Sequence, residues 1–209
     1  IHSSLDELTR APIWYSHHGL IDSCDIQGIQ ILRVCSDTIV SNCQIQSPEF
    51  GWFCQDISIK DSEIHSEYML LHSQHVKIDH LKFTGKYSFQ YMHDLEITNS
   101  YLDTKDAFWH SNNVIVKDSV VKGEYLGWFS KNVTFINCQI IGTQPLCYCE
   151  NLKLIDCEMI DCDLAFEYSD VQATIKGHVD SIKNVKSGII TADGVGEIIN
   201  DDAVMETQG

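Results

Sequence analysis

A unit of nineteen residues repeats nine times along this chain, from Arg10 to Asp180, without an insertion or a deletion. Positions ten and twelve of the unit are apolar in almost every copy, as Val114 and Val116 are in the sixth. A fixed period of this length is typical of a solenoid, in which each repeat forms one coil and packs only on its neighbours. The units begin at Arg10, Ile29, Pro48, Glu67, Lys86, Lys105, Glu124, Thr143 and Cys162.

Each unit predicts short strands. Positions ten and twelve are apolar while the positions beside them are often polar, which is the period-two pattern of a strand with one buried face. Positions fifteen and seventeen repeat this pattern, as in Cys138 and Ile140, and positions four and six add a third apolar pair, as in Phe89 and Tyr91. We therefore expect three strands per coil.

Residues that favour turns separate these strands. Position nine is Asn or Asp in most units, as in Asn113, and position nineteen is Gly or a small polar residue, as in Gly123. These residues tolerate the left-handed backbone that turns a strand. Two other solenoid folds fit less well. A leucine-rich repeat places its Asn after the strand, whereas here the Asn or Asp precedes it, and a hexapeptide helix needs a multiple of six residues, which nineteen is not. The sequence therefore predicts an all-β fold: a single-stranded right-handed parallel β-helix of about ten coils with 19-residue repeats.

The whole chain, residues 1–209, is predicted to be one domain. Residues 1–9 correspond to the last nine positions of a coil, and residues 10–180 form nine coils of nineteen residues. Residues 181–209 lose the register and are expected to form irregular C-terminal coils and a cap, which a solenoid needs over its last open coil. Because the chain starts at Ile1 in the middle of a coil, we expect further N-terminal residues in the complete protein.

The charge of the chain limits its partners. Fourteen Lys and Arg residues face thirty Asp and Glu residues, which gives a formal net charge of -16. Such a field repels nucleic acids and anionic membranes and favours neutral or cationic ligands. No apolar run approaches the roughly 20 residues that span a bilayer. We expect no nucleic-acid partner and no membrane partner; the oligomeric state stays open.

Seven of the nine cysteines share sequence columns with serine, which indicates small, buried side chains rather than disulfides. Cys147 and Cys149 are expected on opposite faces of one strand, and no second pair has zinc-finger spacing. We therefore expect free thiols, a cytoplasmic location, no metal site and no cofactor.

One corner concentrates the residues that could carry chemistry. If positions four and six face inward, position five faces outward, and it holds Trp109 and Trp128 on consecutive coils. Aromatic platforms beside carboxylates suit sugar rings, and glycoside hydrolysis requires paired carboxylates. The candidate catalytic residues are Asp103, Asp106 and His110, and the candidate ligand-binding residues are Lys105, Trp109, Glu124, Tyr125 and Trp128. Two alternatives stay open: the tryptophans could belong to the core, and His110 could be one flat ring in a packed aromatic column.

Several strings of the repeat carry a resemblance to a known family. They are Lys86-Tyr-Ser-Phe-Gln-Tyr91, Leu102-Asp-Thr-Lys-Asp-Ala-Phe-Trp109, Gly123-Glu-Tyr-Leu-Gly-Trp128, Gly142-Thr-Gln-Pro-Leu-Cys-Tyr-Cys-Glu-Asn151 and Asp163-Leu-Ala-Phe-Glu-Tyr168. With them the chain resembles the bacterial family named domain of unknown function 3737 over nearly its whole length. The resemblance implies a pectin-lyase-like right-handed β-helix but no reaction. The Arg-Ile-Lys, Gly-His-Gly and Asn-Thr-Asp strings of polygalacturonases are missing, and the candidate corner holds no Arg, so we expect no pectic activity.

Two hypotheses for function remain. The first is a binding or scaffold module without catalysis. The second is a carbohydrate-active enzyme or a carbohydrate-binding protein that uses the acidic, aromatic-lined face, with a neutral carbohydrate as its partner. The orientation of position five and the separation of the carboxylates distinguish them.

Overall fold

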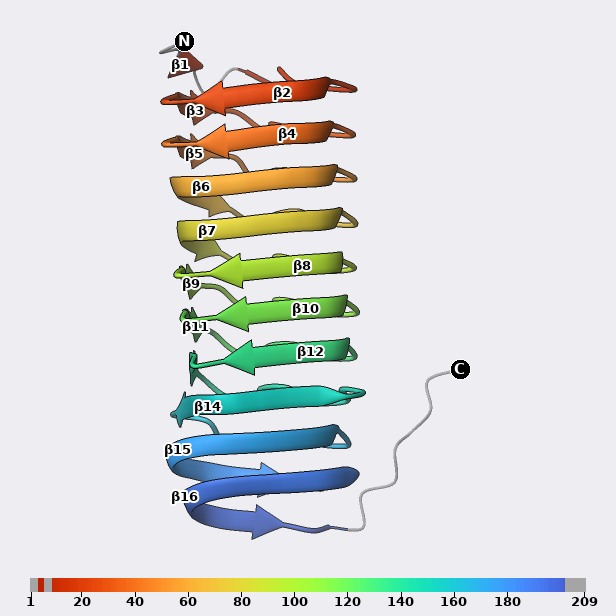
Figure 1. Ribbon diagram of the computed structural model, residues 1–209, viewed down its shortest axis with the longest axis vertical. Helices are drawn as coiled ribbons and strands as arrows, with labels where there is room; N and C mark the ends of the chain where they lie inside the picture. Colours follow the sequence, from red (N-terminus) through yellow and green to blue (C-terminus); the bar gives the residue numbers. More distant parts are fainter. Residues whose placement is uncertain (1–3, 6–8, 202–209) are drawn as a thin grey trace.

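The computed structural model describes residues 4–5 and 9–201 of the chain. These residues form a right-handed parallel β-helix of about ten coils, in which every strand pairing is parallel (Figure 1). The predicted fold class is therefore confirmed. The strands are β1 (Ser4–Leu5), β2 (His17–Asp22), β3 (Asp25–Gln27), β4 (Ser36–Ser41), β5 (Gln44–Gln46), β6 (Gln55–Ser66), β7 (Gln74–Gly85), β8 (His93–Thr98), β9 (Tyr101–Asp103), β10 (Asn112–Lys117), β11 (Val120–Lys122), β12 (Lys131–Ile136), β13 (Gln139–Ile141), β14 (Leu152–Ile160), β15 (Asp170–Lys183) and β16 (Ser187–Ile199).

Each regular coil contains one long strand and one short strand. On the long strands Val114 pairs with Leu95 in the preceding coil and with Val133 in the following coil, nineteen residues away in both directions. The short strands keep this spacing, as where Val121 pairs with Ile140. In β6, β7 and β14 the two strands run on without a break. The long strands and the short strands thus form two faces of the solenoid.

The third side of each coil is not a strand, so the prediction of three strands per coil is wrong. In the sixth unit Asp106, Phe108 and His110 have left-handed backbone, with φ of 53°, 64° and 56°. Left-handed residues that alternate with residues of negative φ fold the chain into consecutive tight turns instead of extending it. As a result Phe108 at position four is fully buried, whereas His110 at position six is exposed.

Serine and cysteine at positions seven and fifteen connect neighbouring coils. The Ser111 hydroxyl donates to the Phe89 carbonyl at 2.7 Å and accepts from the Met92 amide at 3.0 Å. The Cys138 thiol donates to the carbonyl of Val116 at 3.3 Å. A small polar atom at these positions satisfies main-chain groups of the adjacent coils, which explains why the two residue types alternate there. All nine cysteines are free thiols, and eight are buried.

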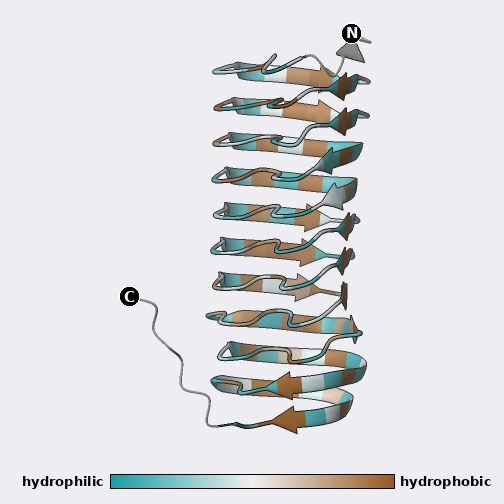
Figure 2. Cartoon of the chain, turned by 180° about the vertical axis from the view of Figure 1, so that it is seen from behind, coloured by the Kyte–Doolittle hydropathy of each residue, from teal (hydrophilic) through white to brown (hydrophobic). Residues whose placement is uncertain are grey.

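The nineteen-residue spacing ends within the ninth unit rather than at Asp180. Cys157 pairs with Ile175, eighteen residues on, and the pairings of β15 with β16 are seventeen and then sixteen residues apart. β15 and β16 consequently run as long curved strands at the C-terminal end (Figure 1). Seen from behind, the irregular third side of the earlier coils runs as thin loops stacked one above another (Figure 2). Within the described residues, no helix has the length and apolarity that a membrane crossing needs.

Candidate functional site

The tryptophans at position five lie along the surface of the third side and bridge successive coils. Trp109 and Trp128 stack face to face, with ring centroids 5.4 Å apart and planes at 4°. The Trp109 indole N–H donates to the Tyr125 carbonyl at 2.6 Å, and that of Trp128 donates to the carbonyl of Gln144 at 2.8 Å. The Gln90 amide, at the same position, donates to the Asp106 carbonyl at 2.7 Å. Trp or Gln at position five of these coils therefore caps a main-chain carbonyl of the following coil.

His110 belongs to a continuous stack of exposed and half-buried rings, the aromatic ladder. The ladder consists of Phe53, His72, Tyr91, His110, Phe129, Tyr148 and Tyr168. The His110 ring lies 5.0 Å from that of Tyr91 and 5.1 Å from that of Phe129, nearly parallel to both. Both faces of the imidazole are covered. These contacts favour the interpretation of His110 as a flat packing ring.

The charged residues of the predicted site are paired between coils. Asp103 forms an ion pair with Lys122 at 3.2 Å, and Lys105 forms one with Glu124 at 3.1 Å. Hydrogen bonding to Glu124 raises the pKa of the Lys105 ammonium, which also lies 5.4 Å from the centre of the Tyr125 ring. All four charged side chains are substantially exposed, and such pairs contribute little to stability.

Asp106 is the exception among these residues, because it is only 7% exposed. Burial raises the pKa of its carboxyl group; the nearby Lys105 ammonium opposes this shift and the Glu124 carboxylate adds to it. In the described part of the chain, no hydrogen bond or ion pair joins the Asp106 side chain to Asp103. The structure thus gathers Lys105, Trp109, Glu124, Tyr125 and Trp128 through direct contacts, but it does not pair the two candidate catalytic carboxylates.

A groove of about 790 Å³ runs along the face of the long strands, and the sequence analysis missed it. We call it the strand groove. Its first rim is position nine of six successive coils: Asp37, Asp56, His75, Asp94, Asn113 and Asn132. Its second rim is position eleven of the same coils: Ile39, Ser58, Lys77, Glu96, Ile115 and Thr134. Position ten lies between the rims and points its side chain inward, so main chain forms the floor.

Left-handed backbone at position nine creates this groove. His75 and Asp94 have φ of 53° and 57°, as do the other position-nine residues of the rim within a few degrees. In an extended strand, positions nine and eleven would share a face with only a shallow gap between them. The turn at position nine instead raises that column into a rim, in which the side chains from Asp56 to Asn113 contact one another from coil to coil. The Asn113 amide, for example, donates to the Asp94 carboxylate at 2.9 Å.

A histidine divides the acidic half of the first rim. The His75 Nδ1 lies 3.3 Å from an oxygen of Asp56, and its Nε2 lies 3.4 Å from an oxygen of Asp94. Asp37, at the end of the rim, pairs with His18 in the coil before it. All of these side chains are about half exposed or more. The rim therefore presents carboxylates and imidazoles at one end and amides at the other.

A second groove, of about 440 Å³, follows the corner between the short strands and the third side. We call it the corner groove. It is lined by His65, Glu67, Thr84, Lys86 and Asp103 among others, and Lys86 pairs with Glu67 across neighbouring coils at 3.0 Å. Asp103 is the one predicted site residue that lines either groove.

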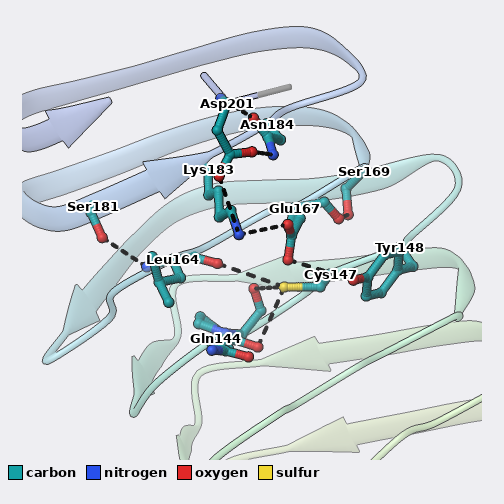
Figure 3. Close-up of polar contacts among 11 residues, drawn as sticks. Gln144, Cys147, Tyr148, Leu164, Glu167, Ser169, Ser181, Lys183, Asn184 and Asp201 are labelled. Atoms are coloured by element: carbon teal, nitrogen blue, oxygen red, sulfur yellow. Dashed lines mark hydrogen bonds and ion pairs between the residues drawn. The ribbon is translucent and has the colours of Figure 1, made fainter. Parts of the chain in front are cut away.

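A polar cluster joins the last coils of the third side. Lys183 lies between Glu167 at 3.0 Å and Asp201 at 3.8 Å (Figure 3). Glu167 also accepts from the Tyr148 hydroxyl at 3.5 Å, and hydrogen bonding to Glu167 raises the pKa of Lys183. The Lys183 and Glu167 side chains are only 22% and 15% exposed. This cluster connects four successive coils through side chains that bond to one another, so we regard it as structural.

In the described residues, no three His, Cys, Asp or Glu side chains converge to hold an ion. The molecule is thus a right-handed parallel β-helix whose described surface includes the strand groove and the corner groove. The sequence profile of the family described as "Protein of unknown function (DUF3737)" matches residues 1–209, and the chain belongs to that family. Compared with the curated proteins, the chain has no match.

Proposed function

We propose that the protein is a binding module that holds an elongated ligand in the strand groove. The groove itself is the observation that carries this proposal: it extends over six coils and has a volume of about 790 Å³. Ligand sites in proteins are concave and typically occupy ≈300–1,000 Å³. Strands that are hydrogen-bonded on both sides also hold side chains more firmly than loops do, which favours binding without rearrangement.

The state of the predicted catalytic residues supports binding rather than catalysis. Asp103 is ion-paired with Lys122, Asp106 is almost buried, and the His110 ring is covered on both faces. A general acid or base has to reach a proton on a bound substrate, at hydrogen-bonding distance. The third side offers these groups no shared cavity, so a binding or scaffold role fits it better.

Blocking the groove tests this function. Ser58 lies in the middle of the second rim, and Ser58→Trp would fill the space between Ile39 and Lys77. Gln139→Trp, at an exposed position of the short strand β13, is the matched control. A thermal-shift screen of cationic peptides and neutral oligosaccharides should give a stabilising ligand for the wild type and the control but not for Ser58→Trp, because only the native groove binds it. A screen in which Ser58→Trp behaves like the wild type with every ligand would contradict the proposal.

Carbohydrate binding in the corner groove is the second candidate function. One observation favours it: Asp103, a candidate catalytic residue of the predicted carbohydrate face, lines that groove together with His65 and Glu67. Carboxylates and imidazoles are suitable hydrogen-bonding partners for sugar hydroxyls. Under this proposal Asp103→Asn weakens binding of a neutral oligosaccharide, while Asp118→Asn, on a different corner, does not. Equal affinity of both variants for every oligosaccharide would exclude it.

A further inference from the structure

The strand groove has a length, a charge and a surface chemistry that define its ligand more closely. Resting on the function proposed above, we propose that the strand groove binds an extended, positively charged peptide segment. Four features of the groove support this occupant: its span, the balance of charge on its rims, the position of His75, and two exposed isoleucines.

The span of the groove suits a short extended chain. The rims cross six coils, from Asp37 to Asn132. Neighbouring strands lie about 4.8 Å apart, so five steps between coils cover about 24 Å. An extended peptide advances about 3.3 Å per residue, and about seven residues therefore fill the groove from end to end.

The charge of the rims favours a cation. Asp37, Asp56, Asp94 and Glu96 contribute four carboxylates, and among the described lining residues Lys77 contributes the one ammonium group. Lys117 approaches Glu96 to 3.1 Å from beside the groove and neutralises part of this charge. With a formal net charge of -16 on the whole chain, no long-range repulsion keeps a cationic ligand away.

His75 lies between two carboxylates of the first rim: its Nδ1 faces Asp56 and its Nε2 faces Asp94. Each carboxylate has about four lone-pair sites, and the ring supplies at most one N–H to either of them. Asp94 also accepts from the Asn113 amide at 2.9 Å. The ammonium or guanidinium group of a ligand can donate to the acceptor positions that remain on Asp56 and Asp94.

The apolar part of the groove selects among cations. Ile39 and Ile115, both on the second rim, are 46% and 38% exposed. Lysine and arginine side chains place their methylene groups on such surfaces while the charged ends reach carboxylates. A small inorganic cation would leave the isoleucines uncovered. A basic peptide covers them and pairs with the rim at the same time.

Fluorescence anisotropy with labelled heptalysine and the full chain, at about 0.1 M salt, tests the proposal. Asp56→Asn and Asp94→Asn should each weaken binding about two- to fivefold, the range for one exposed ion pair. Asp61→Asn is the matched control: it removes the same charge from the same strand β6, outside the groove. It should bind like the wild type, and heptaglutamate should not bind. Equal weakening by Asp61→Asn and Asp56→Asn would overturn the proposal, because it would show attraction to overall charge alone.

Ser58→Trp separates failure of this inference from failure of the proposed function. If heptalysine binding is unaffected by Ser58→Trp while a neutral oligosaccharide loses its binding, the groove is a binding site but its ligand is not a basic peptide. If Ser58→Trp changes binding of neither probe, both proposals are wrong. Loss of heptalysine binding in Ser58→Trp, with Gln139→Trp unchanged, supports both.

Discussion

Replacing Trp109 by phenylalanine or by glutamine separates the two contacts that its indole makes between coils. The ring stacks on Trp128 at 5.4 Å, and the ring N–H donates to the Tyr125 carbonyl at 2.6 Å. Phenylalanine keeps a ring and removes the donor. Glutamine removes the ring and keeps a donor, as Gln90 shows one coil earlier with its bond to the Asp106 carbonyl.

The expected losses follow from these contacts. A hydrogen bond within the protein contributes about 1 kcal/mol, so Trp109→Phe should lower the free energy of unfolding by about that amount. An aromatic pair contributes about 0.5–1.5 kcal/mol beyond the burial of its area. With the lost burial of a partly exposed indole added, Trp109→Gln should lower the free energy of unfolding by about 2 kcal/mol.

Urea unfolding followed by circular dichroism measures these differences. Trp14→Phe is the control, because Trp14 is 43% exposed and its indole N–H makes no hydrogen bond within the described residues. It should cost clearly less than Trp109→Phe. If Trp109→Phe is as stable as the wild type, or loses no more stability than Trp14→Phe does, the carbonyl-capping role of Trp109 is refuted. A ligand-binding role for Trp109 would then be the better interpretation.

Three further predictions concern the third side and the core. Phe108→Gly should be at least as stable as Phe108→Ala in urea unfolding, because φ is 64° there and position four is already Gly51 and Gly127 in other coils; a more stable alanine variant would contradict the left-handed turn. Burial raises the pKa of Asp106 in the folded chain, so the folded state binds its proton more tightly than the unfolded state does. The wild type should therefore lose stability relative to Asp106→Asn as the pH rises through about 4, the ordinary value for Asp, and above it; parallel pH profiles would contradict this. Burial raises the pKa of the Cys54 and Cys147 thiols to about 12 and that of Cys149 to about 11. These cysteines should therefore resist alkylation at neutral pH until the chain is unfolded, and rapid labelling of the native protein would argue against their burial in the core.

The two strand faces could be predicted from the sequence because burial there depends on one simple alternation. Val114 and Val116 point inward from one strand, and their column partners nineteen residues away do the same. The third side could not be predicted in this way. Phe108 and His110 are two residues apart and look like a strand pair, but one ring is in the core and the other stacks on rings outside it. Periodicity cannot distinguish an apolar ring that packs inside from one that packs along the surface.

Neither the strand groove nor the end of the nineteen-residue repeat could be predicted from the sequence, for related reasons. The sequence presents position nine only as a column of turn residues, but a left-handed residue near the start of a long strand also changes where its side chain points. In the ninth unit Val171 still pairs with Leu152, nineteen residues earlier. However, Tyr168 stacks on Tyr148, twenty residues earlier, so an added residue is offset by a shortened corner. Because the residues before and after the added residue are again spaced by nineteen, the columns of the sequence do not reveal it.

Methyl NMR of the isoleucines in the full chain, with heptalysine as the titrant, tests the central claim most directly: that the binding surface is the strand groove. Ile39 and Ile115 lie on its second rim, whereas Ile155 and Ile160 are comparably exposed but lie outside it. We predict that the δ1 methyl signals of Ile39 and Ile115 shift with a common dissociation constant while those of Ile155 and Ile160 do not move. Shifts at Ile155 and Ile160 of the same size, or no shift at Ile39 and Ile115, would contradict the claim.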